Sequence, residues 1–346
     1  MRRELSDLVD GLFAGQRRAL ARLLTIVEGG DPKRLREIVS AIYPRTGAAR
    51  IIGLTGSPGV GKSTLTNALA TELRNHGRSV AILAIDPSSP FSGGALLGDR
   101  VRMQGHHADP KVFIRSMASR GHLGGLSFAT PQAVLLLDAA GFDDIVIETV
   151  GVGQSEVEIA GTADTTIVAM APGMGDGVQA AKAGILEIAD VFVINKADRP
   201  GAGQLASELR GMLEMGHALL DPDPDPETDQ RSEPGSDDAS LSPAGWWPPI
   251  VRTVAVDDEG LPTLAGALED HGRFLTESGE GARRHRSRVM HAVREIAMEA
   301  VRRRVASLDA DDDALLEDLA ERVADRELDP YTAADRLLEV LETSQR

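Results

Sequence analysis

The hydrophobic pattern of residues 51–256 is that of an α/β protein, because short apolar runs alternate with longer segments of helical periodicity. Several runs are apolar at nearly every position, which is typical of strands that helices cover on both faces. The alternation predicts a mostly parallel, doubly wound sheet. The runs expected to form its strands are IIGLT (51–55), SVAILAI (79–85), KVFIR (111–115), DIVIE (144–148), TTIVAM (165–170), VFVIN (191–195) and IVRTVAV (250–256).

Helical segments flank this region on both sides. Residues 1–47 form a predicted N-terminal extension, in which four apolar residues recur at three- and four-residue spacing on one helix face. They are Leu20, Leu23, Leu24 and Val27. We expect this face to pack on the neighbouring domain or on a partner. Residues 48–279 would then form the central domain.

Residues 280–346 predict a helical C-terminal region with its own apolar stripe. The stripe consists of Val289, Val293, Ile296, Ala300 and Val301. Its arginines suggest RNA as one alternative partner, but no aromatic residues are interleaved with them, and a solvated helix face is favoured. We expect the stripe to pack against a second copy of the chain or against the central domain.

The segment between residues 221 and 247 is rich in acidic residues and proline. Such a composition cannot bury enough apolar surface to offset the entropy lost on ordering. We therefore expect a disordered insertion in a surface loop. The pair Trp246-Trp247 at its end is expected to anchor the return to the sheet.

Composition excludes several classes of function. The formal net charge of −16 argues against general binding to nucleic acid or to a membrane surface. Cysteine is absent, which excludes disulfides, thiolate metal sites and a cysteine nucleophile. The first residues contain no apolar core of signal-peptide length, and no apolar run reaches membrane-span length. We expect a cytoplasmic protein.

The strongest chemical signal is a complete phosphate-binding loop. Gly56-Ser57-Pro58-Gly59-Val60-Gly61-Lys62-Ser63 follows a predicted strand and precedes the predicted helix that starts at Thr64. This is the G-x-x-x-x-G-K-[ST] pattern in its strand–loop–helix context. Its glycines let successive N–H groups point at phosphate. Lys62 is expected to bridge the β- and γ-phosphates, and the Ser63 hydroxyl to ligate Mg²⁺.

A second motif selects guanine over adenine. Asn195-Lys196-Ala197-Asp198 follows a buried strand, which is the NKxD arrangement of guanine-nucleotide proteins. One carboxylate, that of Asp198, can accept from both N1–H and the 2-amino group of guanine, whereas N1 of adenine is an acceptor. The stem of Lys196 is expected to cover the base, and Asn195 to tie this loop to the phosphate loop.

Further along, RTVAVDDEG lies where a base-backing loop is expected. Ala255 matches the alanine of the usual Ser-Ala-Lys sequence, but Val254 replaces its serine. The most that we carry over is a hydrogen bond from the N–H of Ala255 to the guanine oxygen.

Three acidic residues are candidates for the γ-phosphate and Mg²⁺ region. Asp86 ends a predicted strand, although Asp-Pro-Ser-Ser is also an ordinary turn sequence. Asp99 follows in a glycine-rich segment, and Glu148 ends another strand ahead of Gly151, whose N–H is expected to sense the γ-phosphate. The adjacent His106-His107 pair has no third ligand at metal spacing, so surface or core packing is favoured there.

The chain resembles the MeaB/ArgK family, which includes the human methylmalonic aciduria type A protein. The matching stretches are GLTGSPGVGKSTLTNAL, AIDPSSPFSGGALLGDRVRM, FIRSMASRGHLGGL, ETVGVGQSE, NKAD and DPYTAADRLLE. The resemblance implies a P-loop NTPase fold of the SIMIBI class, with a G domain and a C-terminal helical dimerisation arm. It also implies that Lys62, Asp86, Asp99 and Glu148 occupy the active site, the three acids with Ser63 near the metal.

The resemblance implies a GTPase that acts as a chaperone of adenosylcobalamin-dependent methylmalonyl-CoA mutase. The family couples GTP hydrolysis to cofactor loading and to protection or reactivation of the mutase. Its implied partners are the mutase, a second copy of the chain and a cobalamin adenosyltransferase. Two alternatives remain, namely a kinase of a transport component and a nickel-insertion GTPase. The second is disfavoured by scattered histidines and the lack of cysteine.

Overall fold

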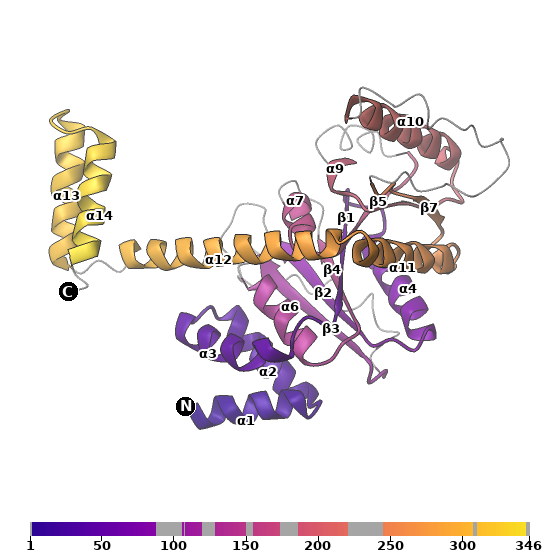
Figure 1. Cartoon of the computed structure of the whole chain (residues 1–346), viewed down its shortest axis with the longest axis horizontal. Helices are drawn as coiled ribbons and strands as arrows, with labels where there is room; N and C mark the ends of the chain where they lie inside the picture. The colour runs from indigo at the N-terminus through magenta and orange to yellow at the C-terminus, as the bar shows by residue number, and fades with distance from the viewer. Residues whose placement is uncertain are drawn as a thin grey trace. The chain divides into compact units, whose positions relative to one another are not determined.

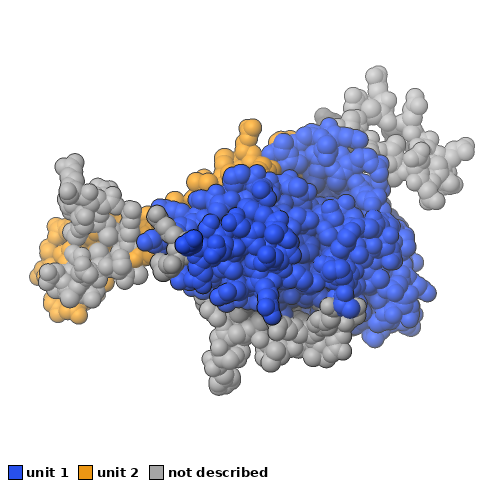
Figure 2. Space-filling view, turned by 90° about the horizontal axis from the view of Figure 1, so that it is seen from below, with its two compact units in different colours: residues 1–282 blue, residues 283–346 orange. Residues whose placement is uncertain are grey.

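The computed structural model describes residues 2–87, 106, 108–119, 129–149, 155–173, 186–220, 245–306 and 310–343. The chain divides into two compact units, residues 1–282 and 283–346 (Figure 2). The greater part of the acidic insertion, residues 221–244, lies outside the described residues.

The first unit is built on one seven-stranded sheet in the order β3-β2-β4-β1-β5-β6-β7 (Figure 1). Each neighbouring pair is parallel, which confirms the doubly wound prediction. The strands are β1 (Arg50–Gly56), β2 (Val80–Pro87), β3 (Val112–Ser119), β4 (Asp144–Thr149), β5 (Thr165–Met170), β6 (Val191–Asn195) and β7 (Ile250–Thr253).

The last strand is shorter than its apolar run predicts, and the expectation of a strand over 250–256 is wrong. The chain leaves the sheet after Thr253 because Val254 pairs with Glu259 in an isolated bridge. Asp258 adopts a left-handed backbone with φ 58° to close this turn.

Helices cover both faces of the sheet. On one face, α4 (Lys62–Asn75) and α11 (Leu261–Glu277) enclose a core with alternate residues of β1, β5 and β6. The other face carries α6 (Thr130–Ala139), α7 (Ser155–Ala160) and α10 (Ala202–Leu220). A short helix, α9 (Leu186–Ile188), precedes β6. The nearly continuous apolar strands are thereby buried on both sides.

The N-terminal extension belongs to this first unit. It forms α1 (Arg2–Phe13), α2 (Arg17–Glu28), α3 (Pro32–Ile42) and a 3-10 turn, η1 (Tyr43–Arg45). Its predicted apolar face is buried and packs on α6, which settles the choice between neighbouring domain and partner. The carboxylate of Asp138 in α6 accepts from the N–H groups of Gly47, Ala48 and Ala49, fixing the entry into β1.

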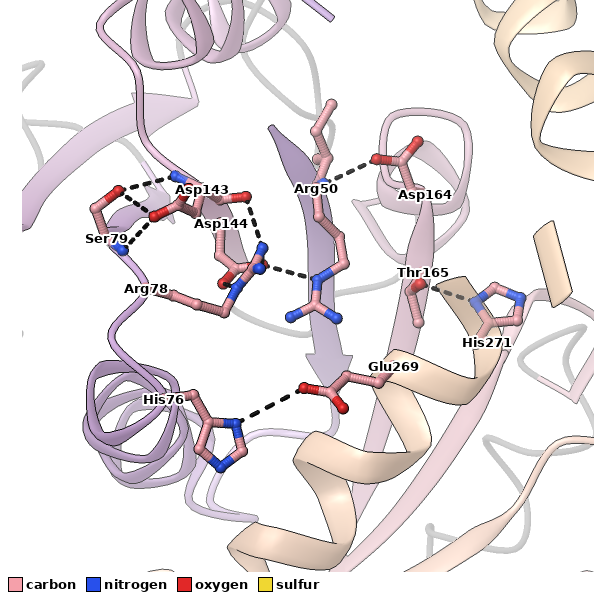
Figure 3. Close-up of polar contacts among 11 residues, drawn as sticks. Arg50, His76, Arg78, Ser79, Asp143, Asp144, Asp164, Thr165, Glu269 and His271 are labelled. Carbon is pink, nitrogen blue, oxygen red and sulfur yellow. Dashed lines mark hydrogen bonds and ion pairs between the residues drawn. The ribbon is translucent and has the colours of Figure 1, made fainter. Parts of the chain in front are cut away.

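The amino ends of the strands are held by a buried carboxylate (Figure 3). Asp144 at the start of β4 is fully buried, and its Oδ1 accepts from Arg50 Nε at 2.7 Å and from Arg78 Nη2 at 2.9 Å. Its Oδ2 accepts from Arg78 Nε. This hydrogen bonding raises the pKa of Arg78 above its ordinary value. The three side chains join β1, β4 and the segment before β2 at the edge opposite the phosphate loop.

Trp246 anchors the return to the sheet as predicted. Its Nε1 donates to the carbonyl of Asp190 at 2.7 Å, and its ring lies 4.7 Å from that of His271. His271 is fully buried and contacts Thr165 Oγ1 at 2.8 Å. Trp247 is 41% exposed.

The C-terminal region consists of α12 (Glu280–Ala306), α13 (Ala310–Ala324) and α14 (Pro330–Thr343), and the second unit begins within α12. The predicted stripe residues of α12 are exposed, with Val293 at 62% and Ile296 at 52%. No helix in the described part of the chain has both the length and the apolar character needed to cross a membrane.

Candidate functional site

The candidate site lies at the carboxyl edge of the sheet, where the ends of β1, β4 and β6 meet. The phosphate loop leaves β1 at Gly56, which has φ 140°. A Cβ at this position would lie 2.1 Å from the carbonyl oxygen of Ala169 in β5. Glycine is required because the loop turns away from the sheet directly against the neighbouring strand.

The loop ends at Gly61, which caps α4 with φ 94°. A Cβ on Gly61 would lie 2.7 Å from Nδ2 of Asn195. The second fixed glycine of the motif therefore makes room for the guanine-motif asparagine as well as for the turn. The phosphate-binding pattern in the sequence already predicts a glycine at position 61. The close approach of Asn195 is a second reason why a larger residue does not fit there.

Lys62 is buried at the first position of α4. Its Nζ donates to the carbonyl of Gly56 at 2.7 Å and to that of Ser57 at 3.1 Å. The ammonium group thus contacts the first two residues of the phosphate loop, and Lys62 lies at the positive end of a helix of 14 residues. A cation and the N-terminal N–H groups of a helix at one point form an anion-binding arrangement.

Ser63 and Glu148 lie in direct contact. Ser63 Oγ donates to Glu148 Oε1 at 2.6 Å, so the end of β4 reaches the start of α4. Glu148 is only 5% exposed. A hydroxyl and a carboxylate are hard oxygen donors of the kind that Mg²⁺ prefers. The donor set therefore fits the magnesium site that the phosphate-loop pattern predicts.

Asn195 connects three segments, as the guanine motif predicts in part. Its Nδ2 donates to the carbonyl of Val60 in the phosphate loop at 2.9 Å. Its Oδ1 accepts from Thr253 Oγ1 at 3.2 Å and from the N–H of Ala255 at 3.1 Å. The side chain is 3% exposed, so these contacts are shielded from water.

The other residues of the guanine motif lie beside Asn195. Lys196 has a left-handed backbone with φ 58°, and its Nζ donates to the carbonyl of Gly59 at 2.7 Å. Asp198 is exposed. Its pairing with guanine stays a prediction.

The base-backing loop has a geometry that the sequence does not show. Val254 and Ala255 are both buried. Because the N–H of Ala255 donates to Asn195, a contact with the guanine oxygen would have to share or replace that hydrogen bond. The role expected of Ala255 therefore stays a prediction.

Not every candidate residue falls in the described part of the chain. Asp99 and Gly151 lie outside it. Asp86 lies in β2 at the same carboxyl edge, two positions beyond Ala84, the register partner of Glu148. Its role near the metal stays a prediction.

The histidine pair shows no metal-site geometry in the described residues. His106 is buried, and its Nε2 lies 3.3 Å from both Thr71 Oγ1 and the carbonyl of Asn67. His107 lies outside the described residues. Within the described ranges, no three His, Asp or Glu side chains gather in a way that would hold a metal ion.

One pair at the site was missed by sequence reasoning. Thr149 Oγ1 donates to Thr55 Oγ1 at 3.0 Å, and both side chains are buried. The pair joins residues 94 positions apart. No local pattern marks it, because threonine is common in strands for its β-branched shape alone.

Comparison with known proteins shows the family of the chain. The model of the family "Methylmalonyl Co-A mutase-associated GTPase MeaB" matches residues 20–310. A Pyrococcus horikoshii protein named "Putative GTPase PH0274" is 46% identical, covering 97% of this chain and 98% of its own length. The "Methylmalonic aciduria type A homolog, mitochondrial" of Caenorhabditis elegans is 33% identical, with 82% and 70% covered.

Among solved structures, that of a protein named LAO/AO transport system kinase is similar with a TM-score of 0.64 and 28% identity, covering 98% of this chain and 97% of its own. The fold, the complete phosphate loop and the relatives agree on a P-loop enzyme that hydrolyses GTP. The chain belongs to the MeaB family of methylmalonyl-CoA mutase-associated GTPases.

Proposed function

We propose that this GTPase is a chaperone of an adenosylcobalamin-dependent acyl-CoA mutase, with methylmalonyl-CoA mutase as the first candidate client. The observation that carries the proposal is the family match over residues 20–310, because the family is named for its association with that mutase. The chain would use GTP hydrolysis to gate cofactor loading and to protect or reactivate the mutase.

In the proposed site, phosphoryl transfer to water requires mainly positioning and charge neutralisation. Lys62 would turn from the loop carbonyls that it now contacts to the β- and γ-phosphates. Mg²⁺ would be held through Ser63, with Asp86, Asp99 or Glu148 in its inner or outer shell, and would supply charge neutralisation. Glu148 would orient the attacking water, for which its position one hydrogen bond from Ser63 is suitable.

The base would lie against the Asn195–Asp198 loop. Asp198 would accept from the two donors on the edge of guanine, and Lys196 would cover the face of the base. The phosphate loop, with Ser57, Pro58, Gly59 and Val60, and the helix start with Thr64 would enclose the phosphates. Asn195 supports this arrangement because it holds the base loop and the phosphate loop together.

The exposed stripe of α12 supports a proposed dimer. Val293 and Ile296 would be covered by a second copy of the chain, since isolated apolar stripes of this kind are normally buried in an interface. The mutase and a cobalamin adenosyltransferase would be the other partners.

A second candidate is a kinase that transfers phosphate to a transport component, because the similar solved structure is of a protein named a transport system kinase. The two candidates differ in the fate of the γ-phosphate. GTP labelled at that position should appear as free phosphate if the chain is a hydrolase. Label recovered on a protein acceptor would favour the kinase.

The client is tested by steady-state GTP turnover of the purified chain, alone and with apo- and holo-forms of methylmalonyl-, isobutyryl- and ethylmalonyl-CoA mutases. We expect one of them to form a complex and to accelerate turnover. A K62A variant under the same conditions controls for contaminating GTPases. Turnover that is equal with and without every mutase, together with no detectable complex, would overturn the client assignment and leave the GTPase activity standing.

A further inference from the structure

Two buried threonines form a hydrogen-bonded pair at the carboxyl edge of the sheet. Thr55 is the last residue of β1 before Gly56, and Thr149 is the last residue of β4. Leu54 and Glu148 are register partners, so the threonines are the next pair along the two strands. They are 0% and 1% exposed, and Thr149 Oγ1 donates to Thr55 Oγ1 at 3.0 Å.

The threonine pair lies on the opposite face of the sheet from the contact between Glu148 and Ser63. Successive strand residues point to opposite faces. The side chain of Glu148 reaches Ser63 on the face of the sheet that α4 covers. The side chain of its register partner Leu54 is buried on the same face, in a core that includes residues of α4. Thr55 and Thr149 share the other face with Gly53, which lies against Ile159 of α7.

The last two residues of β4 therefore hold both ends of the phosphate loop. Thr149 contacts Thr55, the residue immediately before the loop, and Glu148 contacts Ser63, in the first turn of the helix that follows the loop. The carbonyl of Gly56, adjacent to Thr55, accepts from Lys62 Nζ at 2.7 Å. A shift between Thr55 and Thr149 would consequently displace Glu148 relative to Lys62.

We propose that Thr149 is a positioning residue for GTP hydrolysis, and that its hydrogen bond to Thr55 fixes Glu148 relative to the phosphate loop. Packing alone does not require this pair, because valine has nearly the same shape as threonine and suits a buried strand equally well. The hydroxyls add a directional constraint at the point where the proposed water-orienting acid meets the loop. The proposal rests on the roles given above to Lys62 and Glu148.

The test compares T149V, T149S, T55V and the double variant T55V/T149V by kcat and KM for GTP and by melting temperature. A matched control is T165V, which removes a buried hydroxyl that contacts His271 at the start of β5. We expect T149V and T55V each to lower kcat about fivefold with KM within twofold. That corresponds to about 1 kcal/mol at 1.36 kcal/mol per tenfold.

The serine variant keeps the hydroxyl, so T149S should retain at least half of the wild-type kcat. The double variant should be no slower than either single variant, because both remove the same hydrogen bond. T165V should lower the melting temperature without changing kcat. A kcat of T149V equal to that of the wild type would overturn the proposal, as would an equal loss in T165V or additive losses in the double variant. Wild-type protein without GTPase activity would instead contradict the proposed function itself.

Discussion

Ser63 Oγ donates a hydrogen bond of 2.6 Å to Glu148 Oε1, joining the start of α4 to the end of β4 across 85 positions of sequence. The carboxylate of a glutamate lies one methylene farther from the backbone than that of an aspartate would at this position. The contact shows that the longer side chain reaches the predicted magnesium-ligating serine. Glu148 therefore lies beside the residue that we propose to ligate Mg²⁺.

Replacing Glu148 by Gln should lower kcat for GTP by about 100-fold, within the range for a lost acid–base or water-orienting group. The amide keeps the size of the side chain but not its charge, so KM should change little. Phosphate release at saturating GTP, with and without a mutase, measures the effect. Equal turnover of E148Q and wild type under both conditions would show that Glu148 has no such role.

Replacing Asn195 by Ala should destabilise the first unit by about 1–3 kcal/mol, because the buried partners of Asn195 are left unsatisfied. The same change should raise KM for GTP, since it separates the base loop from the phosphate loop. Urea unfolding and GTP titration measure the two effects. N195D serves as a comparison, because it keeps the acceptor for Ala255 and loses the donor to Val60. A normal KM in N195A would contradict the coupling of the two loops.

Replacing Asp144 by Asn should cost about 3 kcal/mol or more of unfolding free energy, because two arginines lose their buried counter-charge. GTP turnover of the remaining folded protein should be unchanged, since Asp144 lies at the opposite edge of the sheet. D143N is a suitable control, because that neighbouring side chain is exposed and should cost less. A loss in D143N as large as that in D144N would contradict the assignment.

Acid should remove the contribution of Asp109 to stability. The hydrogen bond from Arg74 Nε, followed by the backbone N–H of Lys111, lowers the pKa of Asp109 below its ordinary value. The stabilisation is therefore complete above the unfolded pKa of about 3.9 and is lost as pH falls through the lower folded value. D109N should be less stable than wild type at pH 7, by at most about 1 kcal/mol for a partly exposed pair.

The comparison is made by urea unfolding at pH 7 and near pH 3. The difference between D109N and wild type should shrink at the lower pH, because the wild-type carboxylate is then being protonated. A difference that stays constant over this interval would mean that the carboxylate charge does not contribute.

The sequence predicts the elements of this fold better than the contacts between them. All seven strands follow from apolar runs without polar alternation, because helices cover both faces of the sheet. The burial of Leu23 and Leu24 follows from the three- and four-residue spacing of apolar residues along a helix. The end of β7 does not follow from the sequence, because an apolar run does not reveal the bridge from Val254 to Glu259.

At the site, the motifs identify residues whose chemistry is set by spacing along the chain, such as Lys62 and Ser63. The link from Asn195 to the phosphate loop was also predictable, because the guanine motif has a fixed use. The pairs Thr55–Thr149 and Arg50–Asp144 were not, because each joins residues 94 positions apart and depends on strand register. Strand order, which sets that register, cannot be deduced from hydrophobic pattern alone.

We expect GTP to be hydrolysed at the phosphate loop, whose carbonyls Lys62 contacts. This expectation is tested most directly by the release of free phosphate from γ-labelled GTP by the wild-type chain and by K62A. Wild-type protein should release the label as free phosphate, and K62A should release it at least about 100-fold more slowly, as expected on loss of a charge that stabilises the transition state. Equal release by the two folded proteins would show that GTP is not hydrolysed at this loop.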